Sequence, residues 1–248
     1  MTFLQSRRDF LKRSAGVAAM SALPASASEA KEAGSMKEEL LPIIDTHQHL
    51  WDLKQFKLPW LMKDSPLNGN YLMSDYFKAT EGLNIVKTIY MEVDLDPSQQ
   101  QAEAEFVIET CKRADNPMVA GVISGRPASE GFEKYIRTFK NSAYIKGVRQ
   151  VLHNADIPSG VCLDAKFIRG VRLLGELDKS FDICVRQGDL PDAAKLIDAC
   201  PDTRFILDHC GNAKVPDKDR TQWKKDLAEV AKRKRIVCKV SGIVASAE

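Results

Sequence analysis

The heptapeptide Asp45-Thr46-His47-Gln48-His49-Leu50-Trp51 follows the apolar pair Ile43-Ile44 and is the most informative stretch of this 248-residue chain. The whole sequence holds four histidines, and two of them stand here one residue apart. Residues i and i+2 of a β-strand point to the same side, so we expect both imidazoles to project from one face. Two neutral imidazoles that converge supply half of a zinc or manganese site. The alternative interpretation is a polar strand end with two partly solvated histidines.

The charge balance narrows the range of partners. The 36 basic and 34 acidic residues give a formal net charge of +2, and no stretch concentrates the basic residues. Nucleic acid and anionic membrane surfaces are therefore not expected as partners. After residue 27 no stretch is apolar for long enough to be a membrane-spanning helix. The expected partner is a small-molecule substrate, and the oligomeric state stays open.

The first residues have the pattern of an export signal. Ser6-Arg7-Arg8-Asp9-Phe10-Leu11-Lys12 is typical of a twin-arginine signal, and a short apolar run leads from it to the small-residue sequence Ala25-Ser26-Ala27. An ordinary amphipathic N-terminal helix is the alternative. We therefore predict a signal peptide over 1–27, a flexible linker over 28–41 and a folded domain over 42–248. The expected location is the periplasm or the extracellular space.

Short apolar runs alternate with helix-like segments along the domain, which indicates βαβ units and a parallel sheet. Counting the histidine strand there are seven predicted strands, so we expect a (β/α)₈ TIM-type barrel that lacks its eighth strand and is incomplete at the C-terminus. An open doubly wound sheet is the alternative, although no Gly-x-Gly-x-x-Gly sequence follows a strand. The other six predicted strands are 86–91, 118–124, 145–152, 181–186, 204–208 and 236–241, and the predicted helices are 98–114, 131–140, 165–178, 191–199 and 222–234.

Polar residues follow the predicted strands at the ends where such barrels place their reactive groups. Glu92 follows the second strand, and Arg149 and His153 share one face at the end of the fourth. Arg186 closes the fifth strand and His209 follows the sixth. Arginine suits bidentate contact with a carboxylate, so these groups are candidates for binding an anionic substrate. The alternatives are salt bridges at the barrel mouth, a loop cap and a solvated strand end.

The sequences at several strand ends are similar to those of a known family. The first-strand heptapeptide resembles the signature of the lactonase-like, amidohydrolase-2 branch of the amidohydrolase superfamily. Further matches lie at the fourth, sixth and seventh strands, in Lys146-Gly147-Val148-Arg149-Gln150, Asp208-His209-Cys210-Gly211-Asn212 and Cys238-Lys239-Val240-Ser241-Gly242. Together they span residues 43–242 in the family order.

This resemblance implies a distorted TIM barrel that hydrolyses sugar lactones or dicarboxylate lactones with an activated water. It makes His47 and His49 metal ligands for one zinc or manganese ion and His209 the catalytic histidine, although some members of the branch act without metal. The family's general base is an aspartate in a Gly-Ser-Asp-Trp-Pro-like stretch on the eighth strand, which this sequence lacks. We therefore expect the chain by itself to be inactive. A metal-dependent decarboxylase and an inactive remnant remain the alternatives.

Overall fold

The computed structural model describes residues 40–243. The predicted signal peptide and most of the predicted linker lie outside these residues, as do residues 244–248. Within the described range the first element, β1 (Ile43–Gln48), contains His47. The candidate residues of the site all belong to the described part of the chain.

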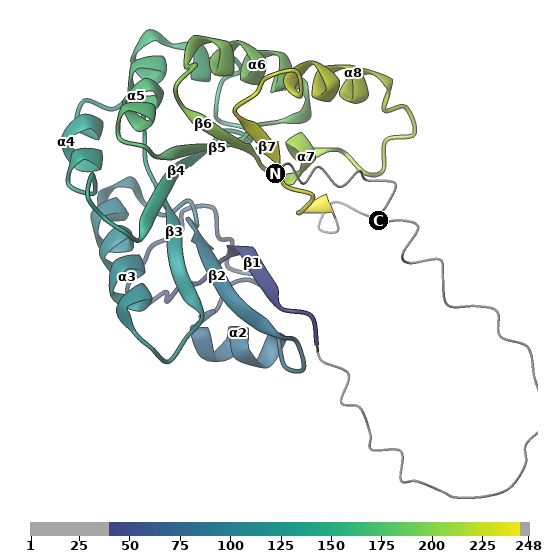
Figure 1. Ribbon diagram of the computed structural model, residues 1–248. Helices are drawn as coiled ribbons and strands as arrows, with labels where there is room; N and C mark the ends of the chain where they lie inside the picture. The colour runs from purple at the N-terminus through teal and green to yellow at the C-terminus, as the bar shows by residue number, and fades with distance from the viewer. Residues whose placement is uncertain (1–39, 244–248) are drawn as a thin grey trace, which may run out of the picture. The chain divides into compact units, whose positions relative to one another are not determined.

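Seven parallel strands form one sheet whose spatial order is the order of the sequence, β1 to β7. Each strand therefore pairs with the next along the chain, which is the arrangement of a TIM-type barrel. The sheet curves as an open half-barrel, with helices along its convex side (Figure 1). After β1 the strands are β2 (Ile85–Met91), β3 (Met118–Ser124), β4 (Ile145–Val151), β5 (Ser180–Cys184), β6 (Arg204–Leu207) and β7 (Ile236–Cys238).

The α-helices follow the predicted segments closely, with two exceptions, the short helices α2 and α7. In α2, Met73, Tyr76 and Phe77 lie at helical spacing, but seven residues are too short a run for periodicity to identify a helix. The α-helices are α2 (Met73–Ala79), α3 (Gln100–Lys112), α4 (Phe132–Arg137), α5 (Ala165–Glu176), α6 (Leu190–Ala199), α7 (His209–Asn212) and α8 (Thr221–Val230), and the short 3₁₀ helices are η1 (Pro97–Gln99), η2 (Val161–Leu163) and η3 (Gln187–Asp189).

Aromatic side chains fix the helices to the sheet. Phe181 of β5 packs edge-to-face against Phe167 of α5 and Phe205 of β6, with ring centroids 5.6 and 6.5 Å apart. All three side chains are buried. Edge-to-face pairs add about 0.5–1.5 kcal/mol each beyond the burial of their area. The ends of β5 and β6, which carry polar residues of the site, therefore rest on a rigid layer.

The first and last strands are the edges of the sheet. Within residues 40–243, β1 pairs only with β2 and β7 only with β6. Ile44 and Val237 are 56% and 64% exposed on these strands. The predicted TIM-type α/β fold is thus confirmed as seven parallel strands in an open half-barrel. Among the described helices, none has the length and apolar composition to cross a membrane.

Candidate active site

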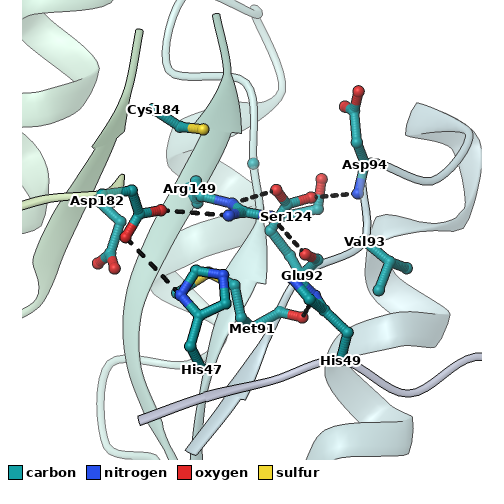
Figure 2. A network of polar contacts seen from close by, with 12 residues as sticks. His47, His49, Met91, Glu92, Val93, Asp94, Ser124, Arg149, Asp182 and Cys184 are labelled. Carbon is teal, nitrogen blue, oxygen red and sulfur yellow. Dashed lines mark hydrogen bonds and ion pairs between the residues drawn. The ribbon is translucent and has the colours of Figure 1, made fainter. Parts of the chain in front are cut away.

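Three imidazoles lie together at the carboxyl ends of β1 and β6. The ring of His47 is 4.9 Å from that of His49 and 4.7 Å from that of His209, centroid to centroid. His47 therefore stands between the other two, as the spacing of the first-strand heptapeptide and the sixth-strand position predicted. Figure 2 shows His47 and His49 beside the charged groups of the neighbouring strand ends.

A left-handed turn presents the third imidazole. His209, Cys210, Gly211 and Asn212, which make up α7, all have positive φ angles between 50° and 69°. Left-handed backbone costs L-residues roughly 1–2 kcal/mol each, so surrounding contacts must hold the turn. The Cys210 amide donates to the Lys239 carbonyl at 3.0 Å and the Trp223 indole donates to the Cys210 carbonyl at 2.9 Å. Backbone strain of this kind is typical of functional sites.

A network of buried charged side chains lies next to the imidazoles. Arg149 of β4 donates from Nε to Glu92 Oε1 at 2.6 Å (Figure 2). It also donates from Nη1 to Asp208 Oδ2 at 3.2 Å. Lys239, just after β7, lies 2.9 Å from Asp182 Oδ2 and 3.2 Å from Asp208 Oδ1. The three carboxylates are fully buried. With three carboxylates against two cations, this network carries one surplus negative charge.

Burial keeps the histidines neutral. It lowers the pKa of His49 to about 3 and the pKa of His47 further still, because water no longer solvates the charged ring. Nearby positive charge on Arg149 acts in the same direction for both rings. The His49 Nδ1 atom lies 3.0 Å from the Met91 carbonyl. Since a carbonyl only accepts, Nδ1 carries the proton of His49 and Nε2 keeps its lone pair.

A mixed set of nitrogen and oxygen donors suits a divalent ion. His47, Asp208 and His209 each offer one ligand atom, and these atoms lie within 4.8 Å of one another. His47 Nε2 is buried and has no hydrogen-bond partner among the described residues. These residues fit a metal site by chemistry and spacing, although the group differs from the predicted pair, since Asp208 and His209 accompany His47 in place of His49.

An aromatic-walled cavity of about 540 Å³ opens beside the imidazoles. Trp51, Trp60 and Tyr71 form its wall, with Trp51 and Tyr71 rings 4.6 Å apart. Trp60 donates its indole N–H to the Val93 carbonyl at 2.7 Å, which fixes the plane of the ring. The cavity is lined by His49, Trp51, Trp60, Leu67, Tyr71, Val93, Asp94, Arg149, Val151, His153 and Asn154.

The other predicted residues fall in three different surroundings. His153 lines the cavity, with Nδ1 3.2 Å from the Cys184 sulfur. Glu92 is buried behind Arg149, and its second carboxylate oxygen accepts from the Asp94 amide at 2.6 Å. Arg186 is not part of the cavity lining, and its guanidinium contacts Asp189 and the Asn154 and Ile157 carbonyls. Their roles in binding a substrate stay predictions.

Sequence reasoning assigned no role to Asp182, Lys239 or the aromatic wall. Asp182 had a usable signal, since a carboxylate inside an apolar strand run requires a buried partner. Lys239 is likewise a charged residue among apolar neighbours, just after β7, so it also requires a buried partner. Trp60 and Tyr71 lie in a segment without helix or strand periodicity, so nothing in the sequence placed them. Asp208 was recognised only as part of the sixth-strand sequence.

The chain belongs to the amidohydrolase-2 family, whose family model, described as amidohydrolase, matches residues 44–247. Among characterised relatives, L-fucono-1,5-lactonase of Burkholderia multivorans is 26% identical over 213 residues, covering 83% of this chain and 69% of the lactonase.

Solved structures share the fold. Amidohydrolase 2 from Bifidobacterium longum subsp. infantis is 28% identical, with a TM-score of 0.62 over 82% of this chain and 74% of that one. An amidohydrolase from Burkholderia multivorans with bound zinc is 24% identical, with a TM-score of 0.69 over 83% and 71% of the two chains. At 24% identity, the similarity to this zinc-bound structure shows a shared fold alone.

Proposed function

We propose that the site hydrolyses a small cyclic ester, a sugar lactone whose ring carries hydroxyl groups and no charge. The observation that carries the proposal is a cluster of three neutral imidazoles, His47, His49 and His209, of which His49 lines an aromatic-walled cavity. Kinship with a sugar lactonase supports the same reaction class.

The cavity lining favours a neutral substrate over a dicarboxylate. Of the residues that line it, Arg149 alone has a permanently charged cationic side chain, and its guanidinium already contacts Glu92 and Asp208. Aromatic faces can pack against the apolar faces of a sugar ring, while Asp94 and Asn154 offer polar atoms for hydroxyl groups. This proposal replaces the anionic substrate that the arginines alone suggested.

Ester hydrolysis needs a base for the attacking water and a donor for the carbonyl oxygen. His209 takes the water proton in our proposal, because its ring stays neutral and Ser241 holds Nδ1 at 2.9 Å. His47 Nε2, the buried nitrogen without a hydrogen-bond partner in the described chain, faces the developing oxyanion. Asp208 is a poor candidate for the base, because Arg149 and Lys239 both neutralise its carboxylate.

A divalent ion held by His47, Asp208 and His209 would polarise the carbonyl and lower the pKa of a bound water. We propose zinc or manganese as the ion, on the basis of the mixed nitrogen and oxygen donors. The steps assigned to His209 and His47 above describe the site without the ion, because a ring nitrogen that holds a metal cannot also take the water proton.

The test is a substrate screen that follows acid release from sugar lactones and dicarboxylate lactones, with carbon dioxide release from aromatic carboxylates as a separate arm. Turnover of a neutral sugar lactone, lowered on the order of 10²–10⁴-fold in His209→Asn, supports the proposal. Turnover of a dicarboxylate lactone instead would refute the neutral substrate, and carbon dioxide release would favour a decarboxylase.

The same screen distinguishes the proposed base, His209, from an aspartate on an eighth strand, which the family resemblance implied. It is run on residues 28–248 and on a protein extended by any in-frame downstream coding sequence. Activity of residues 28–248 alone would show that the base lies among these residues. Inactivity of both proteins on every lactone would contradict the proposed function.

A further inference from the structure

The ammonium of Lys239 sits among the atoms that a metal ion would use. Its Nζ lies 3.2 Å from Asp208 Oδ1 and 3.4 Å from His47 Nδ1, and both residues belong to the candidate ligand group. On its other side it donates to Asp182 Oδ2 at 2.9 Å. The lysine side chain is largely buried, so it cannot exchange these partners for water without moving.

The backbone fixes the lysine at this place. Its amide donates to the Leu207 carbonyl at 2.9 Å, and its own carbonyl accepts from the Cys210 amide at 3.0 Å. Lys239 is thereby tied both to the end of β6 and to the turn that carries His209. The ammonium is held at the cluster by the same hydrogen bonds that shape the imidazole site.

The contact also determines which nitrogen of His47 is protonated. An ammonium donates and cannot accept, so the Nδ1 atom that faces it carries the lone pair and Nε2 carries the hydrogen. A metal bound at Nε2 would need the opposite tautomer, with an N–H directed at the ammonium. A metal bound on the Nδ1 side would meet the ammonium itself.

We propose that Lys239 is the resident cation of the His47, Asp182 and Asp208 cluster and that it weakens the binding of a divalent ion there. Charge balance points the same way. Without the lysine, the three buried carboxylates face one guanidinium, and the remaining two negative charges match a divalent ion. With the lysine, a divalent ion would bring two positive charges against a single surplus negative charge and lie close to an ammonium.

The experiment measures zinc binding to the full chain by calorimetry, for the wild type, Lys239→Met and Lys146→Met. Lys146→Met is the matched control, since it removes the same charge from an exposed position at the start of β4. We expect Lys239→Met to bind one zinc ion on the order of 10–100-fold more tightly than the wild type, and Lys146→Met to match the wild type. Addition of His47→Ala to the Lys239→Met variant should abolish the tighter zinc binding.

A wild type that binds zinc as tightly as Lys239→Met would overturn the proposal. Circular dichroism checks the fold of the variant, and Lys239→Met/Asp182→Asn replaces it where the unpaired carboxylates prevent folding. The double variant keeps the wild-type charge of the network and should also bind zinc more tightly than the wild type.

A second measurement needs no change at Lys239. Nitrogen-15 NMR of the zinc-free wild type, with His47→Gln to assign the signals, reports the tautomer of His47. The Nε2–H form is expected, and the Nδ1–H form would refute the proposal. Neither readout uses a lactone, so failure of the lactonase assignment leaves this test intact.

Discussion

Ser241 Oγ lies 2.9 Å from His209 Nδ1, which joins the segment after β7 to the left-handed turn after β6. Two segments far apart in the sequence thus determine the direction of one imidazole. A hydroxyl accepts or donates as required, so Ser241 can hold either tautomer of the ring. The same segment continues into Gly242, whose backbone adopts a φ of +68°.

Gly242→Ala tests this arrangement. An added Cβ would lie 2.6 Å from both Cγ and Nδ1 of His209, and the positive φ opposes any side chain. We expect displacement of the imidazole, a fall in kcat/KM for the proposed lactone on the order of 10²-fold and a small loss of stability. Gly69→Ala is the control, because its Cβ would meet nothing within 4 Å. Equal activity of both variants in a steady-state assay would contradict the positioning role of this segment.

The sequence predicted the strands well because parallel strands buried on both faces are continuous apolar runs bounded by polar residues. His47, His49 and His209 could be placed because the ends of such strands meet at one edge of a sheet. The pairing of Lys239 with Asp182 and Asp208 could not be placed, since it depends on side chains of three strands and on their rotamers. The aromatic wall lies in an irregular segment, where periodicity gives no orientation.

Arg149→Met should destabilise the fold strongly. The change leaves the buried carboxylates of Glu92 and Asp208 without their shared partner, which typically costs about 3–5 kcal/mol. Urea denaturation followed by circular dichroism measures the loss. Arg137→Met is the control, because its ion pair with Glu133 is exposed and contributes about 0.5 kcal/mol or less. A loss of stability of similar size in the two variants would show that the buried ion pairs of Arg149 stabilise the fold no more than the exposed pair of Arg137.

The stability contributed by His49 should depend on pH in a defined direction. Its pKa falls from 6.5 to about 3 on folding, chiefly through burial, so between these values the unfolded chain binds more protons. Its contribution is therefore lost as pH falls below 6.5. Burial raises the pKa of Glu103 to about 8, which changes stability with pH in the opposite direction. The pH dependence of wild-type stability alone therefore does not report on His49.

The difference between wild type and His49→Asn isolates this group. Asparagine keeps an N–H donor for the Met91 carbonyl but does not titrate. Between pH 6 and pH 4, the stability difference should shrink by up to about 1.4 kcal/mol per pH unit. Parallel curves from urea denaturation at each pH would contradict the lowered pKa.

The twin-arginine pattern predicts export. Replacement of Arg7 and Arg8 by lysine should retain the charge but remove the signal, so that the protein stays in the cytoplasm of a bacterial host with this pathway. Arg13→Lys is the control, because it lies outside the arginine pair. Cell fractionation with immunoblotting measures the distribution, and equal export of the three proteins would refute the signal.

Trp60 tests whether the aromatic wall binds substrate in the ground state. Its ring lines the cavity and remains 39% exposed, so it has free surface for a sugar ring to cover. Trp60→Ala should raise KM for the sugar lactone roughly three- to tenfold, since an aromatic contact contributes about 0.5–1.5 kcal/mol. The value of kcat should change little, because a contact distant from the reacting ester stabilises substrate and transition state alike. Trp60→Phe keeps a ring and should recover most of the affinity. Steady-state kinetics separate the two parameters. A fall in kcat with KM unchanged would show that Trp60 acts on the reacting groups. The substrate would then lie elsewhere in the site.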